Sequence, residues 1–129
     1  MLGVLFKLLN VVNYLHQNKL VHRDIRIETV FVKQCYDEVF VQLHNLKNAF
    51  VIQNKDQRIY GYKSEGINYC APETFRADLG YSAKVDEYAV GVIAYYMFTG
   101  GEFPYQIPST IKKDERIYRF ISKTCIDFK

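Results

Sequence analysis

Apolar side chains recur at helical spacing over the first sixteen residues. They stand three or four positions apart, at Leu5, Leu8, Leu9, Val12 and Leu15. This period predicts an amphipathic helix over residues 2–16. Asn18 and Lys19 follow it, and this polar pair favours a left-handed stop at the end of the helix.

The next part of the chain changes from a helical to a strand-like pattern. Two short runs of β-branched and aromatic residues stand at 30–32 and 39–43, and residues 34–38 separate them. Such a pair predicts a β-hairpin. Residues 44–68 are mostly polar and show no sustained period. A long irregular stretch of this kind in a small domain usually carries function.

Helical signals return in the last third of the chain. Pro72 favours a short helix over residues 72–75. Ser82 is a suitable N-cap for a long helix, and the carboxylates of Asp86 and Glu87 favour its first turns.

That long helix has an unusual composition. From residue 88 to residue 98 it is apolar on every face, which predicts a core helix that is buried on all sides but too short to cross a bilayer. Gly100 and Gly101 end it. A last helix is predicted from about residue 109 to residue 124, with its apolar residues on one side.

Composition and charge narrow the class of protein. The chain has 129 residues, of which 49% are hydrophobic and 24% charged, as in one ordinary globular domain. A net charge of +3 is too small to indicate a nucleic-acid surface. Cys35, Cys70 and Cys125 are widely spaced, which indicates a reducing compartment rather than a disulfide framework. The first six residues lack a basic n-region, and no apolar run reaches about 18 residues, so we expect a cytoplasmic protein without a membrane partner.

Three short motifs occur in a fixed order along the chain. They are His22-Arg23-Asp24, Ala71-Pro72-Glu73 and Tyr81-Ser82-x-Lys84-x-Asp86. This order resembles the catalytic domain of eukaryotic protein kinases, in its C-terminal lobe only. The resemblance implies a mainly α fold with a small β-hairpin, an incomplete kinase-like C-terminal lobe over residues 1–129. It places a catalytic loop at 22–29, an activation segment at 45–73 and a central helix at about 83–99.

The resemblance assigns roles in the catalytic loop. Asp24 matches the base that accepts the proton of the substrate hydroxyl. Arg26 stands where serine/threonine kinases have lysine, and its longer, planar guanidinium changes the contact with the transferred phosphate. Thr29 stands where the family has the asparagine that binds the second magnesium ion.

The metal-binding motif that begins the activation segment is altered too. Asn45, Leu46 and Lys47 stand where the family has Asp-Phe-Gly. Mg²⁺ is usually held by carboxylates, and Asn45 offers only a neutral amide. With both metal ligands replaced, at Thr29 and Asn45, we expect binding of ATP and Mg²⁺ to be weak or absent. In the alternative, the Thr29 hydroxyl and the Asn45 carbonyl still bind Mg²⁺ weakly.

Other residues are implied to be structural or regulatory. His22 would pack in the core, with Leu46 also structural, and Arg23 would pair with a phosphate on the activation segment. The acceptors available are Tyr60, Tyr62 and Ser64. The alternative for these three is plain loop surface.

Three further residues follow from the same comparison. Asp86 would accept backbone N–H groups of the His22-Arg23 turn. Glu73 would be paired in the family with an arginine of a later helical segment, so this chain would leave it without that partner. Gly66 stands where active kinases have a threonine whose hydroxyl contacts the catalytic aspartate, so Asp24 would lose that contact.

Together these features indicate a pseudokinase that acts by protein binding or regulation. Its partner would be another protein or the missing kinase segments. The chain has no Gly-x-Gly-x-x-Gly loop, which leaves open a second interpretation. In that one, the chain is part of an active serine/threonine kinase that transfers the ATP γ-phosphate to protein hydroxyls, with its N-terminal lobe missing here. A decayed gene product without a selected function is a third.

Overall fold

The computed structural model describes residues 1–124 and begins with a long helix, α1 (Leu2–Gln17). Its buried face consists of Leu5, Leu8 and Val12, so the predicted helix is confirmed. Lys19 follows with a φ of 60°, the left-handed conformation that the sequence predicts for this stop. The apolar stripe of α1 faces the hairpin and the central helix α2 (Lys84–Phe98).

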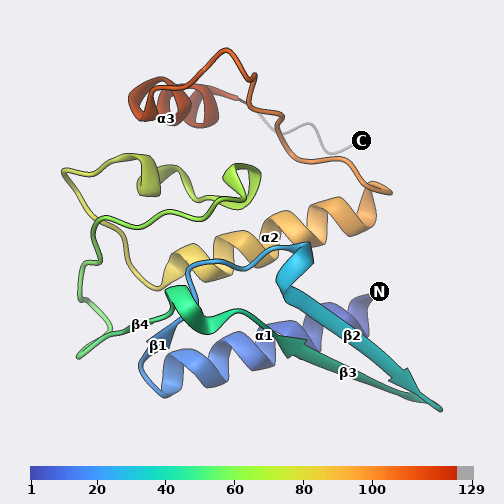
Figure 1. Ribbon diagram of the computed structural model, residues 1–129. Helices are drawn as coiled ribbons and strands as arrows, with labels where there is room; N and C mark the ends of the chain where they lie inside the picture. Colours follow the sequence, from blue (N-terminus) through green and yellow to red (C-terminus); the bar gives the residue numbers. More distant parts are fainter. Residues whose placement is uncertain (125–129) are drawn as a thin grey trace.

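The hairpin consists of β2 (Val30–Cys35) and β3 (Glu38–Leu43), paired antiparallel from Val30–Leu43 to Cys35–Glu38. Figure 1 shows it as a ribbon whose tip extends away from the helices. The five-residue loop predicted from the apolar runs is wrong, because backbone pairing continues through polar residues down to a two-residue turn. Tyr36 stands in that turn with a φ of 53°.

A second, smaller sheet has one of its two strands inside the region 44–68, which was predicted to be irregular. β1 (Leu20–Val21) pairs antiparallel with β4 (Phe50–Val51). A single bridge also joins Ile59 to Tyr81. Strands of two residues are too short to show a period, so the pattern along the sequence does not reveal them.

The central helix α2 crosses the middle of the molecule, with α1 on one side and the segment before α3 on the other (Figure 1). Its buried residues lie between Val85 and Ile93, whereas its last turns are half-buried and Phe98 is 58% exposed. The prediction of burial on all sides is therefore wrong for the C-terminal half. The predicted N-cap is also displaced: the cap position is Ala83, and the Ser82 hydroxyl accepts only a long hydrogen bond, 3.4 Å, from the Lys84 N–H.

The last helix, α3 (Asp114–Lys123), is shorter than predicted. Residues 109–113 are not helical, and the helix begins where Asp114 and Glu115 place carboxylates in its first turn. Ile117 and Ile121 of α3 pack in one cluster with Phe75. Phe75 belongs to the 3₁₀ turn Pro72–Phe75, the element that the sequence predicts there as a short helix.

Cys35 is exposed and Cys70 is buried, and both are free thiols. Cys125 lies outside the described residues. Within residues 1–124, no helix combines the length and apolar character needed to cross a bilayer.

Candidate functional site

The candidate site is organised by a buried carboxylate in the first turn of α2. Asp86 is 1% exposed. Its two oxygens accept hydrogen bonds from the backbone N–H groups of His22 and Arg23, each at 2.8 Å. This is the arrangement that the resemblance implied. A third contact was not anticipated: Nε2 of His16, at the end of α1, lies 2.9 Å from Oδ2 of Asp86.

His22 and Arg23 are held tightly by these contacts. His22 has no exposed surface, and its ring Nε2 lies 3.0 Å from the backbone oxygen of His44. Arg23 adopts a φ of 66°, which is unfavourable for a residue with a side chain. The hydrogen bonds to Asp86 stabilise this conformation, and the chain then turns so that Asp24 enters the core.

Asp24 is 2% exposed, and donors of the chain itself surround its carboxylate. Oδ1 accepts a hydrogen bond from the Ser64 hydroxyl, and Oδ2 accepts one of 3.3 Å from Nδ2 of Asn45. The Arg26 Nε atom lies 3.4 Å from Oδ1, within ion-pair distance but without hydrogen-bond alignment. The predicted loss of a hydroxyl contact at Asp24 is therefore wrong, since a different residue supplies the hydroxyl.

Ser64 replaces the hydroxyl that is missing at Gly66. Its Oγ atom donates to Asp24 and accepts the Gly66 N–H at 3.0 Å. From its position in the sequence, Ser64 was predicted to be either a modification site or plain loop surface. A serine two residues before Gly66 was the available signal, but its reach to Asp24 depends on the path of the loop.

Thr29 closes the catalytic loop on itself. It is buried, its Oγ1 accepts the Arg26 N–H at 3.0 Å, and it lies 2.9 Å from the backbone oxygen of Asp24. It also lies 3.0 Å from the backbone oxygen of Arg26. The Thr29 hydroxyl is therefore hydrogen-bonded to the backbone of residues 24–29, and these bonds compete with any bond to a metal ion.

Asn45 is placed by a left-handed backbone, with a φ of 67°. Its amide nitrogen, rather than its oxygen, faces Asp24. The neighbouring Leu46 is 48% exposed and begins the 3₁₀ turn Leu46–Asn48. It lies on the surface, so core packing does not account for the structural role expected of it.

The donor set does not fit Mg²⁺. Within residues 1–124, no three His, Cys, Asp or Glu side chains converge as a metal site would require. Asp24 is a single carboxylate that already accepts hydrogen bonds from Ser64 and Asn45. Mg²⁺ gives up its bound waters reluctantly, so a protein site usually supplies one or two carboxylates that are free to bind it.

The Arg23 guanidinium contacts two aromatic rings in the unmodified chain. Its guanidinium carbon lies 5.2 Å from the ring centre of Phe50 and 4.9 Å from that of Tyr62. Its Nε donates to the backbone oxygen of Asn48 at 2.6 Å. Of the other predicted phosphate acceptors, Tyr60 is 59% exposed.

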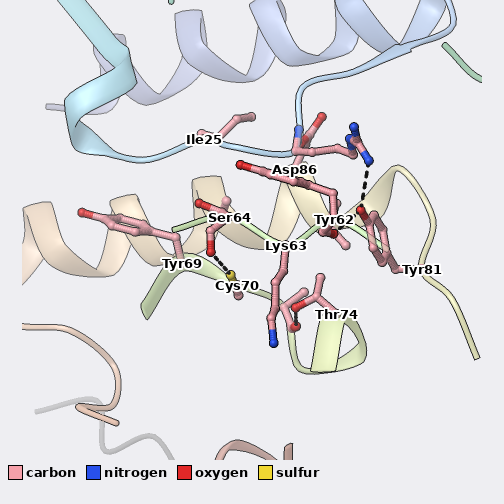
Figure 2. A pocket seen from close by; sticks show the side chains of 13 residues that line it. Ile25, Tyr62, Lys63, Ser64, Tyr69, Cys70, Thr74, Tyr81 and Asp86 are labelled. Carbon is pink, nitrogen blue, oxygen red and sulfur yellow. Dashed lines mark hydrogen bonds between the residues drawn. The ribbon is translucent and has the colours of Figure 1, made fainter. Parts of the chain in front are cut away.

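Figure 2 shows the side chains of Tyr62, Ser64, Cys70, Tyr81 and Asp86 gathered around a small cavity. Its volume is about 20 Å³, enough for about one water molecule. Burial raises the pKa of the Cys70 thiol to about 11. Cys70 is therefore a neutral packing residue at physiological pH and not a nucleophile.

Glu73 is half-buried, and within residues 1–124 it forms no ion pair. It lies near Tyr105, whose pKa rises to about 12 through burial first and the charge of Glu73 second.

Comparison with known proteins supports the resemblance. The family model for the protein kinase domain matches residues 3–128. The chain is 30% identical to calcium/calmodulin-dependent protein kinase type II subunit delta of Oryctolagus cuniculus, over 95% of this chain and 22% of that protein. It is 33% identical to serine/threonine-protein kinase DCLK1 of Rattus norvegicus, over 76% of this chain and 22% of that protein.

A third relative, serine/threonine-protein kinase 33 of Mus musculus, is 26% identical over 98% of this chain and 26% of its own length. The chain thus spans about a quarter or less of the relatives it matches. The match nevertheless runs through nearly every residue of the chain, from α1 to beyond α3. The chain therefore belongs to the protein kinase domain family.

Proposed function

We propose that this chain forms the C-terminal-lobe part of a kinase-like domain that has lost phosphoryl transfer and acts by binding other proteins. The observation that carries the proposal is that the Asp24 carboxylate is already hydrogen-bonded within the chain. Its carboxylate accepts hydrogen bonds on both oxygens from side chains of the chain itself, Ser64 and Asn45.

Phosphoryl transfer by this family relies on positioning and on metal ions that neutralise the developing charge. Family members use ATP with Mg²⁺. Here the Asn45 amide donates a hydrogen bond to Asp24. An aspartate at that position would repel Asp24 unless a cation lay between the two carboxylates. The substitution therefore lets the two side chains contact each other directly. Because the Thr29 hydroxyl is also engaged, neither expected ligand favours metal binding.

The described surface supports the binding part of the proposal. Phe31 and Phe40 are diagonal neighbours on the outer face of the hairpin, because Phe40 pairs with Lys33, two residues after Phe31. Their side chains are 55% and 48% exposed. The Phe31 ring packs against the His44 ring in a tilted arrangement, with the ring centroids 4.1 Å apart. Exposed apolar clusters of this kind usually mark protein contacts.

A stability measurement separates the two interpretations of Asp24. Catalytic carboxylates that must stay available are often held at a cost to stability, so their replacement is neutral or stabilising. A carboxylate that serves as an acceptor for buried donors behaves in the opposite way. We expect Asp24→Asn to lower the free energy of unfolding by about 1–2 kcal/mol, with the exposed Asp37→Asn in the hairpin turn as the control.

The direct test combines metal binding and transfer. Titration with Mn²⁺, followed by electron paramagnetic resonance, is expected to show no saturable site in the native chain and a gain of affinity in Asn45→Asp. Incubation with Mg-ATP or Mn-ATP and a generic protein substrate is expected to transfer no phosphate, both for this chain and for any longer polypeptide that contains it. Transfer that disappears in Asp24→Ala would contradict the proposal.

One observation favours the second candidate, an active serine/threonine kinase. The Ser64 hydroxyl keeps an orienting contact on Asp24, and the named relatives DCLK1 and kinase 33 are serine/threonine kinases. Under this candidate Ser64→Ala would lower kcat without loss of folding. Under the proposal it changes stability alone.

A further inference from the structure

Arg23 is enclosed by residues that come from well-separated parts of the chain. The rings of Phe50 and Tyr62 contact its guanidinium, at 5.2 and 4.9 Å. Its Nε donates to the backbone oxygen of Asn48 at 2.6 Å, and Nη1 lies 3.4 Å from the hydroxyl of Tyr81. The faces of aromatic rings attract a guanidinium because the ring quadrupole makes them partially negative.

Tyr62 is held from both ends. Its hydroxyl accepts a hydrogen bond of 2.6 Å from Nδ2 of Asn48. Its backbone oxygen accepts a hydrogen bond from the Tyr81 hydroxyl. Figure 2 shows Tyr62 and Tyr81 side by side at the edge of the small cavity. The ring of Tyr62 therefore cannot leave Arg23 without breaking at least one of these bonds.

This arrangement differs from the one that the sequence suggested for Arg23. A phosphate would have to accept hydrogen bonds from the guanidinium nitrogens. Two of these, Nε and Nη1, already contact the Asn48 backbone oxygen and the Tyr81 hydroxyl. Burial raises the pKa of the Tyr62 phenol, with the charges of Asp24 and Glu65 as lesser causes. The phenol is thus neutral at physiological pH and serves as an aromatic partner and acceptor, without a charge of its own.

We propose that Tyr62 fastens residues 57–66 to the catalytic loop in the unmodified chain, so that the order of this segment does not depend on phosphorylation. We call Arg23, Asn48, Phe50, Tyr62 and Tyr81 the Tyr62 latch. Its consequence reaches the candidate site directly, because Ser64 lies two residues beyond Tyr62 and hydrogen-bonds Asp24. The proposal is independent of whether the domain transfers phosphate.

The experiment measures limited proteolysis of the full 129-residue chain, produced without phosphate and verified by mass. Trypsin cleavage after Lys63 requires residues 57–66 to detach, so its rate follows the population of the detached state. We expect Tyr62→Ala to accelerate this cleavage at least tenfold. Tyr62→Phe keeps the ring but loses the bond from Asn48, and a two- to fivefold increase is expected. Tyr60→Ala, an exposed tyrosine two positions away, is the matched control and should change the rate less than twofold.

Far-UV circular dichroism at the assay temperature establishes that each variant remains folded. If Tyr62→Ala unfolds the whole chain, Tyr62→Phe and Arg23→Lys decide, because both preserve most of the packing. Arg23→Lys keeps the charge but loses the planar group and its Nε–H, so it should also accelerate cleavage. The proposal is wrong if the unmodified chain is cut after Lys63 as fast as an unfolded peptide. It is equally wrong if Tyr62 variants and Arg23→Lys behave like Tyr60→Ala.

Discussion

Replacement of Asp86 by alanine removes the acceptor that holds the His22-Arg23 turn. Asp86 is 1% exposed and accepts hydrogen bonds from the backbone N–H groups of His22 and Arg23, both at 2.8 Å. His16 adds a third contact at 2.9 Å. The alanine variant leaves two buried amide groups without a partner and releases the constraint on Arg23, whose φ is 66°.

The magnitude follows from these contacts. A hydrogen bond to a charged group contributes about 1.5–3 kcal/mol, and a buried donor left unpaired costs about 1–3 kcal/mol. The adjoining cavity of about 20 Å³ has room for a water molecule that would satisfy one of the freed amides. We therefore expect Asp86→Ala to lower the free energy of unfolding by about 3–4 kcal/mol. Asp86→Asn keeps one acceptor oxygen but turns an amide toward the other N–H, and about 2 kcal/mol is expected.

Urea denaturation at pH 7, followed by circular dichroism, gives these differences from the shift in midpoint at constant m-value. Glu87→Ala is the matched control, because Glu87 is the next residue in the same helical turn and is exposed. Its effect should stay below 0.5 kcal/mol, as is usual for surface positions. If Asp86→Ala costs less than about 1 kcal/mol, Asp86 does not hold the turn and the reasoning fails.

Three further predictions concern buried side chains away from Asp86. The Cys70 thiol, with a pKa of about 11, should react with iodoacetamide at pH 8 at least 100-fold more slowly than the exposed Cys35, as measured by peptide mass spectrometry; similar rates would contradict its burial. The Tyr88 hydroxyl is buried and has no hydrogen-bond partner within residues 1–124, so Tyr88→Phe should leave stability unchanged or raise it by about 1 kcal/mol in urea denaturation. The pKa of Tyr105 is about 12 in the folded chain and about 10 when unfolded, so its contribution to stability is complete below pH 10 and is lost as the pH rises through 12. Tyr105→Phe should therefore flatten the decline in Tm between pH 10 and 12, and an unchanged decline would show that Tyr105 is not its source.

Local signals explain why several elements could be predicted from the sequence. The stripe of α1 follows from a 3.6-residue period that one face of a helix must bury, and Leu5, Leu8 and Val12 are buried as expected. The hairpin follows from two adjacent β-rich runs that need no distant partner. The contact between Asp86 and the His22-Arg23 turn was implied by the resemblance to protein kinases, and the structure shows both of its hydrogen bonds.

The sequence was less informative about where elements end. The hairpin turn is shorter than predicted because the backbone pairs irrespective of side-chain polarity. The pair β1–β4 joins residues about thirty positions apart in two-residue strands, for which no local period exists. Helix α2 loses burial toward Phe98 because burial depends on which elements cover a helix as well as on its own composition.

The contacts at the candidate site were decided by tertiary structure. The motif position placed the missing hydroxyl at Gly66, yet the loop brings Ser64 to Asp24 instead. Arg23 is likewise surrounded by Phe50 and Tyr62, which come from separate parts of the chain. In both cases the residue types were visible in the sequence, but their distances depend on the backbone path of a long loop without periodicity. That path is set by anchors far apart in the chain, the strand pair at Phe50 and the bridge from Ile59 to Tyr81, which only the folded chain brings together.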